Sequence, residues 1–121
     1  MRRRMMKSKI HRATVTAADV DYVGSITLDT RLMGLADIRE YEQVAVLDID
    51  NGNRFETYAI AGGPGEIQVN GAAARLVEPG HRVIVITYAD YDEAELQGGW
   101  SPTVVQVDGD NRPRSRSGFS A

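Results

Sequence analysis

The chain contains no cysteine, which excludes disulfide bonds, thiolate metal sites and a cysteine nucleophile. Aromatic residues make up only 7% of its 121 residues, and valine, isoleucine and alanine supply most of the apolar side chains. That composition favours strands over large helical cores. No apolar run approaches the roughly 20 residues of a membrane span, and none follows the basic N-terminus as a secretory signal requires. We therefore expect a soluble cytoplasmic protein without a membrane partner.

Charge is nearly balanced, with 14 basic and 17 acidic residues and a net charge of −3. Six Lys or Arg residues lie within the first twelve, and we expect this basic arm to be solvated or to face a ligand. Nucleic acid usually binds a broader basic surface, so we expect no nucleic-acid partner. The two histidines, His11 and His81, are far apart in the sequence and show no recognisable metal-ligand spacing. No metal site is predicted.

The alternation of apolar and polar residues predicts a mainly β protein with six or seven short strands and small helical pieces. Strands are expected at residues 9–16, 22–28, 43–48, 54–60, 67–69, 82–88 and 103–107. Closure into a barrel is favoured, because it removes exposed strand edges. Residues 1–107 would form this single β-barrel domain. The polar and basic residues 108–121 are predicted to be a flexible C-terminal tail.

Three blocks of sequence resemble the aspartate 1-decarboxylase family, and they occur in the family's order and nearly its spacing. The first joins Lys9-Ile10-His11-Arg12-Ala13-Thr14-Val15-Thr16 to Tyr22-Val23-Gly24-Ser25. The second is Asn51-Gly52-Asn53-Arg54-Phe55-Glu56-Thr57-Tyr58-Ala59-Ile60, and the third is Val69-Asn70-Gly71-Ala72-Ala73-Ala74. The resemblance covers residues 5–107. A Gly-Ser pair alone would be explained more simply by a strand bulge, but the three blocks together are specific.

The resemblance implies a double-psi β-barrel that forms a homotetramer, with active sites between neighbouring subunits. It also implies conversion of L-aspartate to β-alanine and CO2 for pantothenate and coenzyme A biosynthesis. The cofactor would be a covalent pyruvoyl group made from Ser25. Such a group forms a Schiff base with the substrate and accepts the electrons released on decarboxylation, as pyridoxal phosphate does elsewhere.

The atoms of Gly24-Ser25 are suited to make that group. Attack of the Ser25 hydroxyl on the Gly24 carbonyl closes a five-membered ring and converts the amide to an ester. β-Elimination, tautomerisation and hydrolysis then leave a pyruvoyl group, and two chains of residues 1–24 and 25–121 remain. Glycine leaves the carbonyl open to attack and permits backbone angles that other residues resist. By resemblance, Thr57 and Asn70 assist this cleavage.

The resemblance also assigns roles in the decarboxylation. Tyr58 is the expected proton donor to the former α-carbon. Arg54 lies four residues earlier on the same strand face, where its planar fork suits a carboxylate. Lys9 would balance the second negative charge of the substrate. Thr57 would lie beside the substrate.

The remaining predicted site residues are backbone and wall positions. Gly71, Ala72 and Ala73 match the segment whose backbone amides hold the substrate, since a turn of small residues can aim N–H groups at a carboxylate. His11 and Tyr22 match positions in the wall of the site.

Two departures and two alternatives stay open. The loop at residues 62–66 is shorter than in the family, and Arg75 stands where histidine is common. One alternative is a β-barrel interaction module that never cleaves and binds nucleic acid through its basic arm. The other is a pyruvoyl enzyme for a different amino acid, because a methylene is worth only about 1–3 kcal/mol of discrimination.

Overall fold

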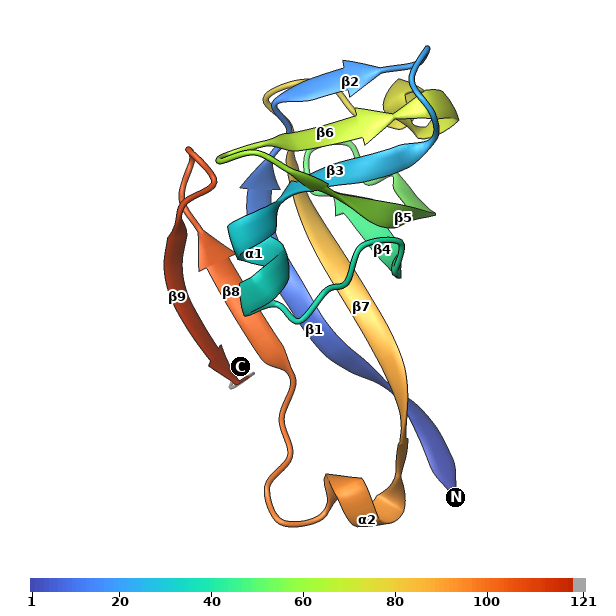
Figure 1. Cartoon of the computed structure of the whole chain (residues 1–121), viewed down its shortest axis with the longest axis vertical. Helices are drawn as coiled ribbons and strands as arrows, with labels where there is room; N and C mark the ends of the chain where they lie inside the picture. Colours follow the sequence, from blue (N-terminus) through green and yellow to red (C-terminus); the bar gives the residue numbers. More distant parts are fainter. Residues whose placement is uncertain (119–121) are drawn as a thin grey trace.

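The computed structural model describes residues 1–118. Within this range the chain forms nine strands, two short α-helices and one 3-10 helix (Figure 1). The elements are β1 (Arg2–Thr14), β2 (Ala17–Asp19), β3 (Ser25–Asp29), α1 (Thr30–Leu35), β4 (Gln43–Asp48), β5 (Arg54–Gly62), β6 (Ile67–Asn70), η1 (Gly71–Leu76), β7 (Arg82–Asp92), α2 (Glu93–Leu96), β8 (Thr103–Val107) and β9 (Pro113–Gly118).

The strands form one sheet in the order β2-β6-β3-β5-β4-β7-β1-β8-β9. In Figure 1, β2, β6 and β3 cross the upper end of the molecule, while β1, β7 and β8 run along its length. The strong right-handed twist of neighbouring strands accumulates into this change of direction. The predicted mainly β class is confirmed, and the architecture is consistent with a β-barrel.

The core lies on one face of the sheet, which we call the inner face. Alternate residues of each strand point to it, as Val44 and Val46 do on β4 and Ile26 and Leu28 on β3. Most of the buried side chains are valine and isoleucine, whose branched shape packs well on a pleated surface. The opposite, outer face carries half-exposed and exposed residues of β4, β5 and β7, and it is the face on which most of the predicted site residues lie.

Local signals in the sequence agree with several elements. Asp29 caps α1, because its carboxylate accepts a hydrogen bond from the Arg31 backbone N–H at 2.7 Å. β4 and β5 form an antiparallel hairpin, as the Asn51-Gly52 pair between them favours, and Gly52 has a φ of +77°. The alanines after Asn70 lie in η1.

Residues 108–118 differ from the expected flexible tail. They turn at residues 108–112 and continue as β9, which pairs antiparallel with β8. Asn111 anchors the turn: it is buried, and its side chain bonds to both the N–H and the carbonyl of Thr14 and to the carbonyl of Gly65. This contact joins residues 97 positions apart, which composition cannot indicate. The rest of the predicted tail, residues 119–121, lies outside the described residues.

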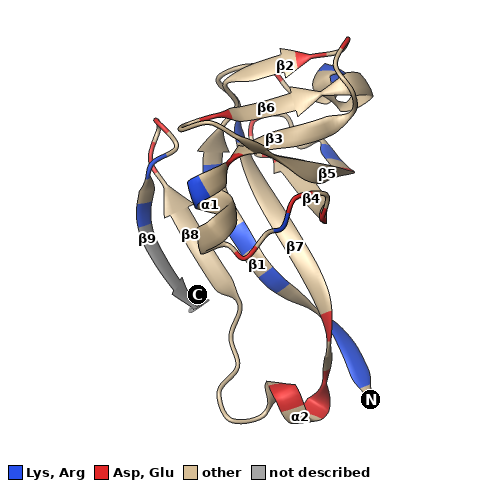
Figure 2. Ribbon diagram, in the orientation of Figure 1, with Lys and Arg blue, Asp and Glu red and all other residues tan. Residues whose placement is uncertain are grey.

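The basic arm is part of β1 and has acidic neighbours. Arg2 and Arg4 form ion pairs with Asp92 and Asp90 of β7, and Arg3 pairs with Glu93 of α2 (Figure 2). The arm therefore presents much less net positive charge than its sequence suggests.

Among residues 1–118, no helix has the length and the apolar character needed to cross a lipid bilayer.

Candidate active site

Ser25 is the first residue of β3 and only 1% exposed. Its Oγ accepts a hydrogen bond from Asn70 Nδ2 at 2.9 Å, and its hydroxyl donates to the Val23 carbonyl at 3.3 Å. Ser25 and Asn70 are direct partners in the antiparallel pairing of β3 with β6. The hydroxyl that would attack the Gly24 carbonyl is thus fixed by the sheet and shielded from bulk water.

Asn70 is fully buried, and all of its side-chain hydrogen bonds lie around Ser25. Nδ2 donates to Ser25 Oγ and also to Thr27 Oγ1 at 3.1 Å, while Oδ1 accepts from Gln68 Nε2 at 2.8 Å. The sequence predicted Asn70 but missed Thr27 and Gln68. Both lie two residues from a predicted residue on the same strand face, and this period of two is the signal that would have found them.

Gly71 is pressed against the backbone of Gly24, the residue before the bond to Ser25. Its φ is +74°, and a Cβ there would lie 2.6 Å from Gly24 Cα and 2.9 Å from Gly24 N. Gly24 itself has no such demand, because its φ lies outside the left-handed region and a Cβ would have no heavy atom within 4 Å beyond its chain neighbours. The sequence predicted that a glycine is required at Gly24, but in the structure the position that requires glycine is Gly71.

β5 carries three predicted residues on two faces. Tyr58 pairs with Gln43 and Arg54 with Leu47, which puts both on the outer face as expected. Ser25 is on that face too. Ile26 and Ala59 are paired and both point into the core, so the residues just before them, Ser25 and Tyr58, point to the opposite face.

Thr57 alternates to the other face of β5, where it pairs with Val44. In the described part of the chain no hydrogen bond joins Thr57 to Ser25 or Asn70.

Lys9 and His11 are on β1 and occupy two rows across the outer face. In one row, Lys9 pairs with Ile86 of β7, which pairs with Ala45 of β4. In the other row, His11 pairs with Ile84 of β7, and Ile84 pairs with Leu47 of β4. Leu47 is also the partner of Arg54 on β5. Directly opposite residues share a face, so Lys9, His11 and Arg54 lie on one side of the sheet. By strand spacing, β1 is about 14 Å from β5 and about 19 Å from β3.

The environment of His11 disfavours its charged form. Burial lowers its pKa, and the nearby Lys9 and Arg12 lower it further. Its Nδ1 is buried without a hydrogen-bond partner in the described residues. The neutral imidazole is therefore the favoured form of this side chain.

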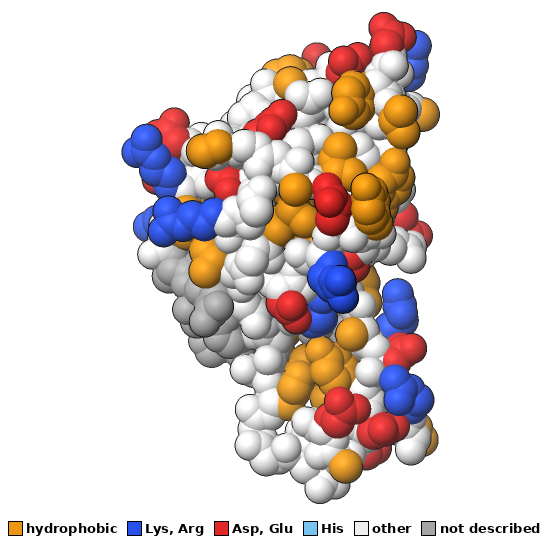
Figure 3. Space-filling model, in the orientation of Figure 1, with side chains coloured by type: hydrophobic (Ala, Val, Ile, Leu, Met, Phe, Trp, Pro, Cys, Tyr) orange, Lys and Arg blue, Asp and Glu red, His pale blue; other side chains and the backbone are white. Residues whose placement is uncertain are grey.

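The other predicted wall and backbone positions surround Gly24. Tyr22 and Val23, in the segment before it, are 52% and 72% exposed. Ala72 is exposed and Ala73 half-buried on η1. Figure 3 shows apolar side chains gathered at this end of the molecule. An open hollow of about 370 Å³ on the outer face is lined by Ala45, Arg54, Phe55, Glu56 and Tyr88.

Comparison with known proteins gives the relationship of the whole chain. The sequence model of the family described as aspartate decarboxylase matches residues 1–114. The chain belongs to the aspartate decarboxylase family. The aspartate 1-decarboxylase of Myxococcus xanthus is 58% identical over 114 residues, which cover 93% of this chain and 87% of that protein. The aspartate 1-decarboxylase of Syntrophobacter fumaroxidans is 55% identical over 118 residues, covering 96% and 94%.

The short loop at residues 62–66, which the sequence set apart from the aspartate decarboxylase family, is held by one side chain of its own and one from β3. Glu66 accepts a hydrogen bond from the Gly63 N–H at 2.9 Å, and Asp29 accepts one from the Gly65 N–H at 2.8 Å. Gly65 has a φ of +74°, which a tight turn allows most easily with glycine. The loop is thus tied to the end of β3.

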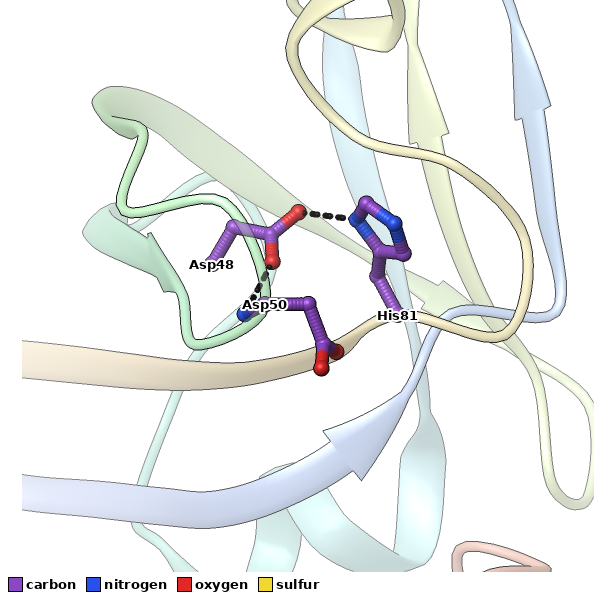
Figure 4. Close-up of side chains that lie close together, drawn as sticks. All are labelled: Asp48, Asp50 and His81. Carbon is purple, nitrogen blue, oxygen red and sulfur yellow. Dashed lines mark hydrogen bonds and ion pairs between the residues drawn. The ribbon is translucent and has the colours of Figure 1, made fainter.

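His81 lies outside the three blocks that resemble the aspartate decarboxylase family, and the structure places it beside two carboxylates. Its Nδ1 is 2.7 Å from Asp48 Oδ2 (Figure 4). The other Asp48 oxygen accepts from the Asp50 N–H at 2.8 Å, and Asp50 accepts from the Arg82 N–H at 2.7 Å. The hydrogen bond to Asp48 raises the His81 pKa, with further contributions from the charges of Asp48, Asp50 and Glu78. These bonds fasten the β4–β5 hairpin to the start of β7.

Proposed function

We propose that this chain is a pyruvoyl-dependent aspartate 1-decarboxylase, a carboxy-lyase that makes β-alanine and CO2 from L-aspartate for pantothenate and coenzyme A biosynthesis. The named activity of relatives at 55–58% identity supports the reaction. The observation that carries the mechanism is the arrangement at the Gly24-Ser25 bond. A buried serine hydroxyl there is held by an amide donor, and Gly71 is pressed against the preceding residue.

Maturation begins with attack of Ser25 Oγ on the Gly24 carbonyl carbon. The carbon–nitrogen bond breaks, the Ser25 nitrogen takes the proton, and the backbone is then joined through an ester. Loss of the Ser25 α-proton with cleavage of the Cβ–Oγ bond releases the Gly24 carboxylate. Tautomerisation and addition of one water then expel ammonia. Asn70 Nδ2 supports the cleavage, because an N–H donor aimed at the serine oxygen stabilises its deprotonated form before the attack and its departure with the Gly24 carboxylate in the elimination.

Ser25 fits as the source of a pyruvoyl group because the residue after the cut stays fixed. Ile26 to Asp29 pair with β5, and Ser25 to Leu28 pair with β6. The new terminus would therefore remain buried beside Asn70. When formed, the pyruvoyl group supplies the electron sink for decarboxylation.

The chain's own residues would orient the substrate and move one proton. Arg54, on the outer face of β5, offers a bidentate contact to one carboxylate, and Lys9 supplies a second positive charge. The Tyr58 hydroxyl would deliver the proton to the former α-carbon, and its ring packs against Tyr41 with centroids 6.4 Å apart. The backbone amides of Gly71, Ala72 and Ala73 would hold the substrate near the cut.

His11 and Tyr22 remain wall positions in this proposal. The resemblance assigned Thr57 a place beside the substrate and a part in the cleavage. We assign it no chemical step, because its side chain lies on the face of β5 opposite to Ser25.

We infer that the active protein is a cytoplasmic homotetramer with its sites shared between subunits. Measured along the sheet by strand spacing, β1 with Lys9 is about 19 Å from β3 with Ser25 in one chain. A lysine side chain spans roughly a third of that distance. A neighbouring copy that supplies Lys9 would resolve the mismatch. The exposed apolar side chains Tyr22, Val23 and Tyr41 support the same inference, because such groups favour burial against a partner.

Intact-mass spectrometry of the purified protein tests the proposal. It should show two chains of residues 1–24 and 25–121, the larger one carrying a carbonyl that reacts with hydroxylamine. Ser25→Ala should fold, remain a single chain and form no β-alanine from aspartate. An unbroken wild-type chain with full decarboxylase activity would rule the mechanism out.

The two alternatives are distinguished by simple assays. The nucleic-acid alternative relies on the positive charge of the basic arm. In the structure, Arg2, Arg3 and Arg4 of this arm are paired with Asp92, Glu93 and Asp90. Salt-dependent binding of the uncut chain to oligonucleotides would favour it. A different substrate would appear as faster CO2 release from another amino acid, such as glutamate, than from aspartate.

A further inference from the structure

The side chains around the Ser25 hydroxyl form a group of four on one face of two neighbouring strands. Ser25 and Thr27 lie on β3, and Gln68 and Asn70 lie opposite them on β6, paired Thr27 with Gln68 and Ser25 with Asn70. Asn70 is the centre of this group, because its amide bonds to the other three side chains. The direction of those bonds decides whether Ser25 Oγ faces an N–H donor or an amide oxygen.

One of the three partners leaves the orientation of the Asn70 amide open, because the Thr27 hydroxyl can donate or accept a hydrogen bond. The other two favour the same orientation. The Ser25 hydroxyl donates to the Val23 carbonyl, which leaves its oxygen to accept from Asn70, and Gln68 presents its Nε2 donor to Asn70 Oδ1 at 2.8 Å. With Oδ1 occupied in this way, Nδ2 is directed at Ser25 Oγ.

This orientation matters for the cleavage chemistry. With Nδ2 toward Ser25, the serine oxygen receives an N–H donor, and its own proton is directed to the Val23 carbonyl. With the amide flipped, an amide oxygen would face the serine oxygen, and the Asn70 amide would no longer stabilise the charge that this oxygen carries before the attack and on leaving with the Gly24 carboxylate. The side chain of Gln68 is half-buried and bonds to Asn70 rather than to Ser25, so any effect of Gln68 acts through Asn70.

We propose that Gln68 is a positioning residue for backbone cleavage, which holds the Asn70 amide with its N–H toward the Ser25 hydroxyl. This inference rests on the proposed self-cleavage and adds a residue that neither the composition nor the three family-like blocks indicated. It assigns Gln68 no contact with the reacting atoms.

Replacement of Gln68 by glutamate tests the proposal. At pH 8 the introduced carboxylate would have only acceptor oxygens, so Asn70 would turn its Nδ2 toward that carboxylate and its Oδ1 toward Ser25. The full-length chain, isolated before it has cleaved, is incubated and sampled by intact-mass spectrometry. We expect Gln68→Glu to cleave at least about tenfold more slowly than wild type, equivalent to roughly 1.4 kcal/mol in the barrier.

Lowering the pH separates orientation from a general structural effect. A glutamic acid with a pKa near 4.3 is partly protonated at pH 4.5, and its O–H then donates to Asn70 Oδ1 as glutamine does. The rate of Gln68→Glu relative to wild type at the same pH should rise at least about threefold between pH 8 and pH 4.5. Gln68→Met, which has no donor at any pH, should be slow throughout.

Gln97→Glu is the matched control, since it makes the same chemical change beyond α2, at the opposite end of the molecule from β6 (Figure 1). It should cleave like wild type at every pH. Wild-type rates for Gln68→Met, or a slow Gln68→Glu with no recovery at low pH, would overturn the role of Gln68. If the wild-type chain itself stays uncut, the proposed function fails, and this result is separate from any ratio between variants.

Discussion

Replacement of Gly71 by alanine tests whether close packing against Gly24 holds the bond to be cut. Gly71 combines two demands: a φ of +74° and a Cβ position only 2.6 Å from Gly24 Cα. Carbon atoms in contact lie about 3.5–4.0 Å apart, so Gly24 would have to move by roughly 1 Å. The left-handed backbone alone costs an alanine about 1–2 kcal/mol.

The displacement should affect cleavage far more than folding. A misplacement of about 1 Å at a reacting centre can cost on the order of 100-fold in rate, and we expect that loss for Gly71→Ala. The melting temperature should fall by roughly 4–16 °C, since each kcal/mol shifts a domain of this size by about 4–8 °C. The time course of intact mass gives the cleavage rate, and thermal unfolding of the uncut Ser25→Ala background gives the stability.

Gly52→Ala is a control that introduces the same left-handed backbone strain but no contact of the new Cβ with Gly24. Gly52 has a φ of +77°, and an added Cβ there would meet no heavy atom within 4 Å. It should lose stability through the backbone and cleave at the wild-type rate. If Gly71→Ala cleaves as fast as Gly52→Ala, contact with Gly24 does not control the reaction and our account of Gly71 is wrong.

Two further predictions concern turnover and pH. Tyr58→Phe should cleave normally but lose about 100-fold or more of its kcat for β-alanine formation, because a general acid typically contributes 10²–10⁴; normal turnover would remove the tyrosine from proton delivery. His81→Gln should reduce thermal stability mainly at low pH. The His81 pKa is raised above its ordinary 6.5, so its contribution is complete below about 6.5 and disappears as pH rises through the higher folded value. A melting-temperature difference between wild type and His81→Gln that stays constant from pH 5.5 to 9 would contradict this.

Features with a strict local period could be predicted from the sequence. The period of two along β5 placed Arg54 and Tyr58 on one face, and the register with Leu47 and Gln43 agrees. The bounds predicted for residues 43–48 and 103–107 match β4 and β8. These elements depend on their own residues and on near neighbours in the chain, so their bounds can be predicted from the sequence alone.

Features that depend on distant partners could not be predicted. β9 contains alternating Arg and Ser with no apolar signal, and its order comes from pairing with β8 and from the bonds of Asn111 to Thr14. The tie between His81 and Asp48 spans 33 positions in the sequence. Gln68 was overlooked for a different reason: its place two residues before Asn70 on the same strand face was a signal, but the role of its amide depends on the hydrogen bond to Asn70 that only the structure shows.

The position of β1 in the sheet limits when the backbone can be cut and where the two pieces can go afterwards. β1 lies between β7 and β8; it pairs with β7 along most of its length and with β8 over residues 8–11. If the bond is cut as proposed, these pairings should keep residues 1–24 in place, and gel filtration without denaturant should recover both pieces together. The same interleaving implies that folding comes first, because the Ser25 pocket exists only when the sheet is assembled. Separate synthesis of the two pieces would replace an intramolecular strand insertion with an association between chains, and it would omit the bond whose rearrangement is proposed to create the pyruvoyl group.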